Sequence, residues 1–243
     1  MEPVLAEIVV SHVLNEAVEQ WIAELDTAKR TKESYRKGIK RYVSYLHAER
    51  LQGDQRTDVL SYKAHRVRSY SANTVNSYLV PVRRFYTWLS ALGAGPNVAA
   101  DIKGAKLSRG FKKDYLTAPQ AGKALGTHTS ESIKDLRDNA IIALMVHTGL
   151  RTVEVARANI EDMHPSGSAT VLDIQGKGRS SKDDFVVVPV SVEDKIRTYL
   201  LSREDITEGE PLFASISPRN TGGRMTTRSI SRIAKDTLRQ AAT

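Results

Sequence analysis

The sequence predicts a mostly α-helical protein of two domains, a helical bundle followed by a mixed α/β domain with a small antiparallel sheet. Residues 11–92 repeat apolar side chains three and four positions apart, which is the spacing of amphipathic helices. Within residues 169–190, two strand-like runs flank a glycine-rich turn, which is typical of a β-hairpin. The length of 243 residues suits one large domain or two modest ones, so it agrees with this division.

Four helical stretches are expected in the N-terminal part, together forming a small bundle. Residues 11–26 and 27–51 each gather apolar side chains on one side, and the second stretch carries its lysines and arginines largely on the other. Leu60–Tyr70 is a weaker stretch. Ser71–Leu92 is a strong one, in which Pro81 could produce a kink.

A change of composition separates the two parts. Gly93 and the residues up to Pro96 end the helical pattern. Residues 96–115 then combine five basic residues with little periodicity, which indicates a linker. The expected domains are therefore residues 9–95 and residues 116–243.

The second domain is expected to mix helices and strands. Thr117 begins a helix, and residues 136–147 are apolar nearly all round, which indicates a buried central helix. Gly149 ends that helix and another begins at Thr152. The remaining expected elements are strands at Ala169–Ile174 and Phe185–Val190 and helices at Val192–Leu201 and Thr226–Ala241.

The net charge of +8 is unevenly distributed. Residues 28–115 hold 19 basic and 6 acidic residues, whereas residues 1–27 hold six acids and no Lys or Arg. Residues 116–243 are close to balanced, with 17 basic and 16 acidic residues. A concentrated positive segment favours a polyanion partner, because neutralising phosphates releases condensed counterions. The alternative is a solvated positive face without a dedicated partner.

Several classes of protein are excluded by composition. The chain has no cysteine, which rules out disulfides and thiolate zinc sites, and its histidines show no ligand spacing, so no metal is expected. No stretch approaches the about 18 apolar residues of a membrane helix, and the acidic start does not fit a signal peptide. A cytoplasmic protein is therefore expected.

Residues 147–154 (HTGLRTVE) form the most informative segment. An apolar helix ends at Gly149, and Arg151 follows at the start of the next helix, where free backbone N–H groups favour an anion. The planar guanidinium matches two phosphate oxygens, and Glu154 can brace it. A buried Arg151–Glu154 ion pair without a ligand is the alternative.

The second informative segment is Gln175–Arg179 (QGKGR), between the two strand-like runs. Glycines on both sides of Lys177 predict a hairpin turn with one long cation at its tip. Such a lysine can give a proton to a leaving group if nearby cations lower its pKa. An ordinary exposed turn lysine is the alternative.

Together, the two segments resemble the tyrosine site-specific recombinases of the phage-integrase and Xer type. That family has Thr-Gly-Leu-Arg-x-x-Glu followed by a hairpin with Gly-Lys-Gly at its turn, and both occur here in the same order. Residues 31–46 and 71–89 look like the DNA-facing helices of its core-binding domain, and residues 112–117 look like the entrance to its catalytic domain.

By this resemblance, Arg151 would hold the scissile phosphate and stabilise its pentavalent transition state, with Glu154 in support. Lys177 would protonate the departing 5′ hydroxyl. The family further implies double-stranded DNA as partner, a homotetramer on two sites, and no cofactor. Expected DNA contacts are Lys32, Arg36, Lys37, Lys40, Arg83, Arg84, Lys112, Lys113, Arg179, Arg228 and Arg232.

The family's His-x-x-Arg motif and nucleophilic tyrosine, which forms a 3′-phosphotyrosine, have no counterpart here. The last histidine is His164, and the last tyrosine, Tyr199, lies in an apolar pattern that indicates core packing. The chain is therefore expected to be C-terminally incomplete, a fragment or a natural truncation, and to bind DNA without cleaving it alone. A non-catalytic DNA-binding regulator is one alternative. A helix-turn-helix repressor using residues 148–159 is another.

Overall fold

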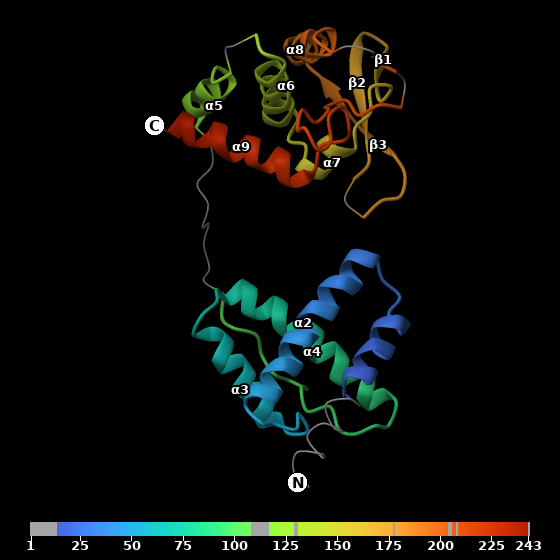
Figure 1. Cartoon of the computed structure of the whole chain (residues 1–243), viewed down its shortest axis with the longest axis vertical. Helices are drawn as coiled ribbons and strands as arrows, with labels where there is room; N and C mark the ends of the chain where they lie inside the picture. Colours follow the sequence, from blue (N-terminus) through green and yellow to red (C-terminus); the bar gives the residue numbers. More distant parts are fainter. Residues whose placement is uncertain are drawn as a thin grey trace. The chain divides into compact units, whose positions relative to one another are not determined.

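The computed structural model describes residues 14–107, 117–128, 131–176, 178–203, 206–207 and 209–242. Contacts divide the chain into two compact units, Met1–Phe111 and Lys112–Thr243 (Figure 1). The first unit is helical, and the second combines helices with one three-stranded antiparallel sheet. The predicted fold class is confirmed.

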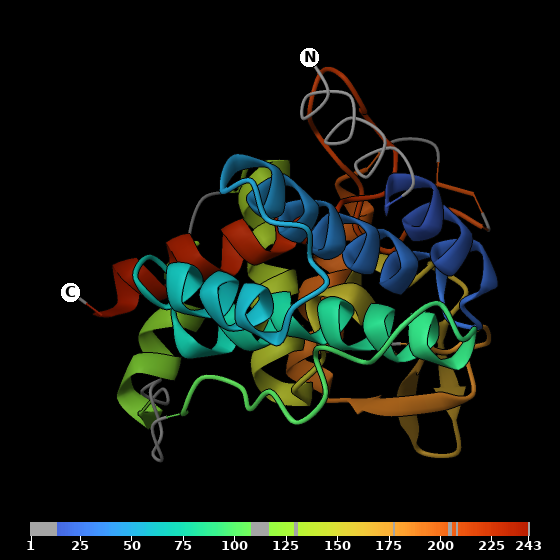
Figure 2. The same cartoon turned by 90° about the horizontal axis from the view of Figure 1, so that it is seen from below.

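The described part of the N-terminal unit contains four helical segments. Residues 14–24 are helical, and they are followed by α2 (Lys29–Ala48), α3 (Arg56–Val67) and α4 (Ala72–Ala91). The Oγ of Ser71 accepts a hydrogen bond from the Thr74 N–H, which caps the start of α4. Helices α2 and α4 pack against each other (Figures 1 and 2).

The contact between α2 and α4 depends on a glycine facing a proline. A Cβ atom at Gly38 would lie 2.5 Å from Cγ of Pro81, so a side chain there would force the helices apart. Pro81 is buried, and α4 continues through it from Ala72 to Ala91. The proline therefore fills the contact between the two helices.

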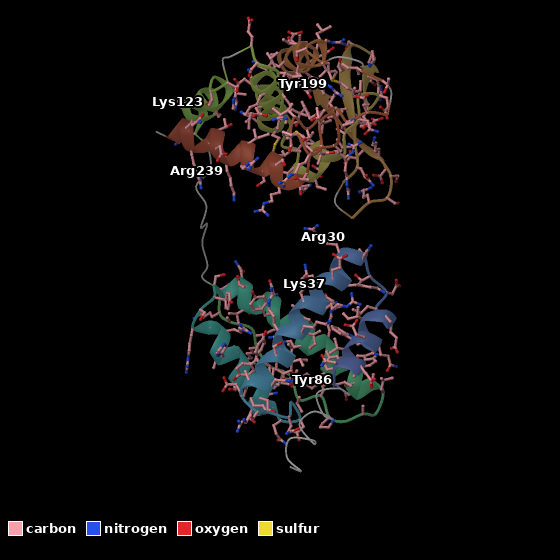
Figure 3. The ribbon with its side chains drawn as sticks, in the orientation of Figure 1. Arg30, Lys37, Tyr86, Lys123, Tyr199 and Arg239 are labelled. Carbon is pink, nitrogen blue, oxygen red and sulfur yellow. The ribbon has the colours of Figure 1, made fainter. Side chains whose placement is uncertain are left out.

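The core of this unit is rich in aromatic side chains. Tyr86, labelled in Figure 3, is buried; its hydroxyl lies 3.0 Å from that of Tyr42 and donates to the Gly53 carbonyl at 2.6 Å. Burial raises the pKa of Tyr86 to about 12 and raises the pKa of Tyr42 further. The largest fully buried side chains of the unit include Trp21, Tyr42, Tyr62, Phe85 and Ile22.

The segment after α4 is more ordered than a free tether. Ala99 and Ile102 are buried in the helical core. The Asn76 side chain accepts from the Ala105 N–H at 2.6 Å and donates to the Ala105 carbonyl at 3.1 Å. The first half of the expected linker thus packs onto the bundle, because its apolar residues find partners there. Residues 108–116 lie outside the described part of the chain.

The C-terminal unit places a small sheet beside a group of helices. Strand β2 lies between β1 and β3, and both pairings are antiparallel. Helix α6 packs against α8, and α9 runs along α5, α6 and α7 (Figure 1). The elements are α5 (Ala118–Leu125), α6 (Ile133–Thr148), α7 (Thr152–Arg157), β1 (Met163–Ser166), β2 (Ala169–Ile174), β3 (Asp184–Val188), α8 (Val190–Leu201) and α9 (Thr227–Ala242).

The core of the C-terminal unit is mainly aliphatic. Ala140, Ile141, Ala143 and Leu144 of α6 are all fully buried, which agrees with a central helix that is apolar nearly all round. Tyr199 of α8, labelled in Figure 3, is 1% exposed, and its hydroxyl accepts a hydrogen bond from the Ala214 N–H at 3.0 Å. The prediction that Tyr199 is a core residue is confirmed.

Membrane-spanning helices and clustered metal ligands are both absent from the described ranges. No helix there combines the length and apolar character needed to cross a membrane. No three histidine, aspartate or glutamate side chains in the same ranges come together as a metal site would require.

Candidate nucleic-acid interface and phosphate site

Arg151 stands at a turn that the sequence forces to be tight. Helix α6 ends at Gly149, whose φ of 69° places it in the left-handed region that glycine tolerates best. Leu150 is buried, and it anchors the turn in the core. The next residue, Arg151, precedes α7 and leaves 72% of its side chain exposed.

Glu154 holds Arg151 in place. One carboxylate oxygen of Glu154 accepts from the Arg151 backbone N–H at 2.7 Å, and the other accepts from Arg151 Nη1 at 3.1 Å. The Glu154 side chain is only 5% exposed, whereas the guanidinium faces solvent. The ion pair of the alternative interpretation is present, but only its carboxylate is buried. A buried carboxylate fixes an exposed arginine, which can still receive an anion.

The helix-end contribution is smaller than the sequence indicated. Helix α7 has only six residues, and Glu154 already takes the Arg151 N–H. A short helix with its first donor satisfied contributes little field at its N-terminus. Attraction for an anion must therefore come mainly from the guanidinium.

The hairpin between β2 and β3 has a longer loop than the tight turn expected. Ile174 pairs with Asp184, so residues 175–183 connect the strands. Gly178 has a φ of 85°, a conformation that favours glycine. Lys177 lies outside the described residues. On either side of it, Gly176 and Arg179 line an open groove together with Arg151 and Glu154.

Two of the predicted DNA contacts on α2 form ion pairs with Glu19 of the first helix. Arg36 Nε lies 2.9 Å from one Glu19 oxygen and Lys40 Nζ lies 3.1 Å from the other. Hydrogen bonds from Lys40 and Arg36 lower the pKa of the Glu19 carboxyl. Lys32 donates to the Ala23 carbonyl at 3.1 Å. These three cations therefore face the first helix.

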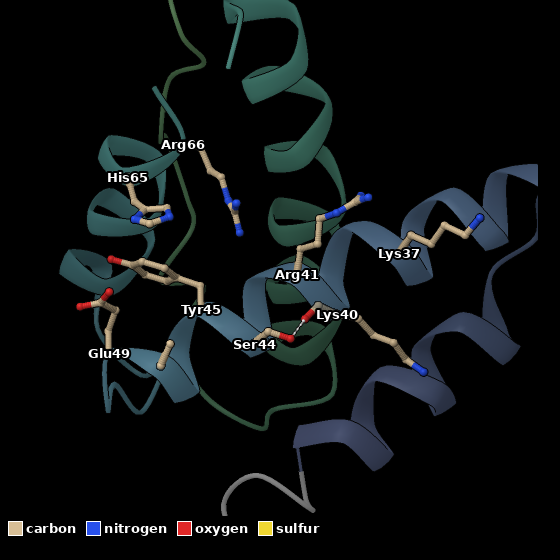
Figure 4. Close-up of a pocket in the computed structure, with 9 residues that line it drawn as sticks. Lys37, Lys40, Arg41, Ser44, Tyr45, Glu49, His65 and Arg66 are labelled. Carbon is tan, nitrogen blue, oxygen red and sulfur yellow. Dashed lines mark hydrogen bonds between the residues drawn. The ribbon is translucent and has the colours of Figure 1, made fainter. Parts of the chain in front are cut away.

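Further residues of α2 border a groove against α3 (Figure 4). Arg66 reaches from α3 toward α2, with its guanidinium 5.0 Å from the centre of the Tyr62 ring. Arg41 of α2 lies 5.0 Å from the centre of the Tyr78 ring. Lys37 is exposed on the same border. Arginines stacked on tyrosine rings keep their charge while losing little freedom on binding an anion.

Arg41 and Arg66 were not among the contacts predicted from the sequence. Arg66 Nε and the Tyr62 hydroxyl are buried without a hydrogen-bond partner, so unsatisfied polar atoms lie beneath the surface of this groove. A usable signal was present, because Tyr62 and Arg66 stand four residues apart and share one face of a helix.

The remaining predicted contacts are scattered over the described surface. Arg83 buries two guanidinium nitrogens that have no hydrogen-bond partner, and Arg84 lies 5.6 Å from the centre of the Tyr35 ring. Arg228 and Arg232 are exposed on α9, and neither is among the described residues lining the Arg151 groove. Lys112 and Lys113, like Lys177, lie outside the described ranges.

A helix-turn-helix reading of residues 148–159 does not fit. A recognition helix must lie on the surface to enter the major groove. Helix α7 has six residues and buries Glu154, Val155 and Ala156. The helix before it is buried as well, so this alternative is wrong.

Family comparisons match both units. Residues 115–243 match the phage integrase family, and residues 18–93 match the family described as phage integrase, N-terminal SAM-like domain. The matched ranges contain the Arg151 segment and the α2–α4 helices respectively.

Curated relatives include bacterial recombinases. The chain is 30% identical over 178 residues to tyrosine recombinase XerD of Shewanella oneidensis, covering 71% of this chain and 57% of that protein. It is 27% identical over 217 residues to tyrosine recombinase XerC of Pelobacter propionicus, covering 86% and 68%. The chain thus spans little more than half the length of XerD and of another XerC, from Thermodesulfovibrio yellowstonii, of which it covers 56%.

Solved structures share the fold. A lambda integrase (75–356) dimer bound to a COC′ core site superposes with a TM-score of 0.71 at 14% identity, over 94% of this chain and 81% of that one. XerH in a post-cleavage complex with difH superposes with a TM-score of 0.69 at 15% identity, over 87% and 63%.

Proposed function

Because this chain belongs to the phage integrase family, we propose that it is the DNA-clamping part of a site-specific recombinase. In complete form, such an enzyme would break and rejoin DNA through a 3′-phosphotyrosine, with four copies acting on two sites. Structures of lambda integrase as a tetramer bound to a Holliday junction support this assembly. Cytoplasmic DNA would be the substrate. The domains would be residues 9–95 and 116–243, connected by residues 96–115, of which the first half packs onto the helical bundle.

The observation that carries the proposal is the setting of Arg151. Its exposed guanidinium is oriented by the buried Glu154 carboxylate and borders the same groove as Gly176 and Arg179. A phosphate in that groove would meet a preorganised fork of donors. Because the pentavalent transition state carries more negative charge than the ground state, this contact would strengthen as the reaction proceeds.

Lys177 is the proposed general acid. It stands between Gly176 and Gly178, on the loop that borders the Arg151 groove. A protonated lysine near the departing 5′ oxygen would deliver the proton that this oxygen needs to leave. Cations around the groove, Arg151 and Arg179 among them, would favour loss of that proton.

The attacking tyrosine is the missing part. After residue 116 the sequence has one tyrosine, Tyr199, and its buried hydroxyl is engaged with the Ala214 N–H. A side chain in that position cannot reach DNA. We therefore expect these 243 residues to bind duplex DNA without forming a covalent intermediate.

The N-terminal unit would supply most of the affinity. Lys37, Lys40, Arg41 and Arg66 border one groove, and Arg36 lies beside it, where it shares Glu19 with Lys40. Contacts of this kind with phosphates position DNA without reading its sequence. They also make binding steeply dependent on salt, since each neutralised phosphate releases about 0.9 counterions.

Fluorescence anisotropy of a labelled duplex at increasing salt tests this function. The affinity should fall linearly on a double-logarithmic plot, and Arg41→Ala or Arg66→Ala should each reduce the slope by about one. Arg197→Ala on α8, where Arg197 pairs with Glu193, is the matched control and should leave the slope unchanged. Salt-independent binding, or none, would overturn the proposal. A covalent adduct on nicked duplex would show that a nucleophile was overlooked.

A further inference from the structure

The loop between β2 and β3 needs an anchor if it is to act in chemistry. Residues 175–183 lie between paired strand ends, and two of them border the Arg151 groove. A loop of this length with glycines at 176 and 178 has many conformations open to it. Placing a reactive group within hydrogen-bond reach of a phosphate requires that most of these be removed.

Arg157 provides the first anchor. Its Nη1 donates to the Gly176 carbonyl at 3.0 Å and lies 3.4 Å from the Gln175 carbonyl. Arg157 is the last residue of α7, and Arg151 immediately precedes the first. The candidate phosphate-binding residue Arg151 therefore lies at the start of α7, and Arg157, which binds the first residues of the loop, lies at its end.

Asp162 provides the second anchor, on the returning side. Both of its carboxylate oxygens lie 2.5 Å from Lys182 Nζ, and one also accepts from the Asn159 N–H at 2.6 Å. The Asp162 side chain is 7% exposed and that of Lys182 is 28% exposed, so the carboxylate of the pair is largely shielded from water. Residues 157–162 thus hold both sides of the loop.

Bonds within the loop connect the two anchors. The Gln175 side chain donates to the Arg179 carbonyl at 2.9 Å, and the Arg179 N–H donates back to the Gly176 carbonyl at 3.2 Å. The Arg179 guanidinium pairs with Asp183, next to Lys182. A displacement at either anchor is therefore passed along the loop.

We propose that Arg157 and the Asp162–Lys182 pair form a clamp that positions the β2–β3 loop against the Arg151 groove. They are positioning residues and do not touch DNA. The clamp exists independently of function, but its purpose rests on the proposed recombinase chemistry, in which Lys177 of this loop is the acid. Lys182, the other lysine of the loop, is assigned to structure because its ammonium is committed to Asp162.

The absence of cysteine from the sequence makes the clamp directly measurable. Ser180→Cys introduces a single thiol in the exposed part of the loop, and a nitroxide attached there reports local motion by electron paramagnetic resonance. In this background, Arg157→Met should raise the mobile fraction on the order of tenfold, as loss of a charge-assisted hydrogen bond implies. Arg157→Lys, which keeps the charge and a donor, should restore most of the immobile signal.

Controls separate a loosened loop from a damaged fold. Arg197→Met, on α8, should leave the nitroxide spectrum unchanged, and circular dichroism should show native helicity in every variant. If Arg157→Met does not fold, Lys182→Gln replaces it and should loosen the loop from the other side. An immobile spectrum in the folded Arg157→Met and Lys182→Gln variants would overturn the clamp.

The same proteins separate this inference from the proposed function. Salt-dependent binding of duplex DNA with an unchanged loop spectrum would reject the clamp and leave the recombinase proposal standing. A loosened loop in a protein that does not bind DNA would support the clamp and reject the recombinase proposal.

Discussion

The two units of this chain use their cations in different ways. In the N-terminal unit, Arg41 and Arg66 lie over tyrosine rings, and Arg36 and Lys40 share the exposed carboxylate of Glu19. Ring contacts or a half-exposed carboxylate hold these groups, and Arg36, Lys40 and Arg41 are open to solvent. They can exchange their present contacts for phosphates at little cost.

In the C-terminal unit, several arginines are structural. Arg137 pairs with Asp138 and donates to the Ala214 carbonyl, with only 6% of its side chain exposed. Arg224 donates to the carbonyls of Ala156 and Ala158, next to the end of α7. Arg151 differs from Arg137 in being exposed, and it differs from Arg224 in being oriented by a buried carboxylate, since Arg224 is held by backbone carbonyls. The excess of positive charge therefore indicates the candidate DNA-binding surface of the N-terminal unit. It does not indicate the candidate phosphate site of the C-terminal unit, which is recognised from the contacts of Arg151.

The largest expected effect concerns the structural arginines. Asp138→Ala leaves the Arg137 guanidinium buried without its partner, since Nε and Nη2 both bond to Asp138 Oδ1 at 3.0 and 2.7 Å. Urea denaturation should show a loss of about 3–5 kcal/mol in the free energy of unfolding. Asp236→Ala removes the exposed pair with Arg239 and should cost less than about 1 kcal/mol. Equal losses would mean that Arg137 is not a structural arginine.

The second effect is a pH dependence of stability that is expected for the tyrosine-rich core of the N-terminal unit. Burial raises the pKa of Tyr86 from 10.0 to about 12, so its protonated form stabilises the folded N-terminal unit below pH 10. That contribution, about 3 kcal/mol at most, is lost as the pH rises through 12. Both tryptophans lie in this unit, so their fluorescence should report a falling urea midpoint between these pH values. Tyr86→Phe should remove its share of the pH dependence and leave the share of Tyr42, whose pKa burial also raises; an unchanged slope would contradict the assignment.

The smallest effect tests whether Glu19 competes with DNA for Arg36 and Lys40. Glu19→Gln should raise the affinity for duplex DNA roughly two- to fivefold at low salt, and the gain should shrink as salt increases. Because the pKa of Glu19 is lowered, its pairing with Lys40 and Arg36 stabilises the fold at pH values above the ordinary pKa of 4.5. This stabilisation is lost as the pH falls through the lowered pKa. Anisotropy titrations measure the effect, with Glu193→Gln as control. Weaker binding by Glu19→Gln would show that the pairs serve DNA binding instead.

Much of the fold could be predicted because long amphipathic patterns are strong signals. The helices α2 and α4 follow from apolar periodicity over many residues, the central helix from its apolar run, and the end of that helix from Gly149. Strand β1 could not be predicted, since it has only four residues, Met163–Ser166, and includes a proline. Its strand conformation comes from pairing with β2.

The candidate site was predictable in its residue types and less so in its geometry. The sequence indicates Arg151 and Glu154 but not that one is exposed and the other buried, because a three-residue spacing fits either arrangement. Gly-Lys-Gly indicates a tight turn, but pairing of Ile174 with Asp184 leaves a longer loop. The contacts of Arg157 with Gly176 and of Asp162 with Lys182 could not be predicted, because they join residues that are distant in sequence.

The most direct test asks whether positions 151 and 177 engage one phosphate. A duplex selected for tight binding is prepared with a neutral methylphosphonate at each linkage in turn, and affinities are measured for the unmodified chain, Arg151→Ala and Lys177→Ala. We predict one linkage at which neutralisation weakens binding about tenfold for the unmodified chain but hardly at all for either variant. The account would be contradicted if neutralisation and substitution weakened binding additively at every linkage. It would also be contradicted if Arg151→Ala and Lys177→Ala removed the effect of neutralisation at different linkages.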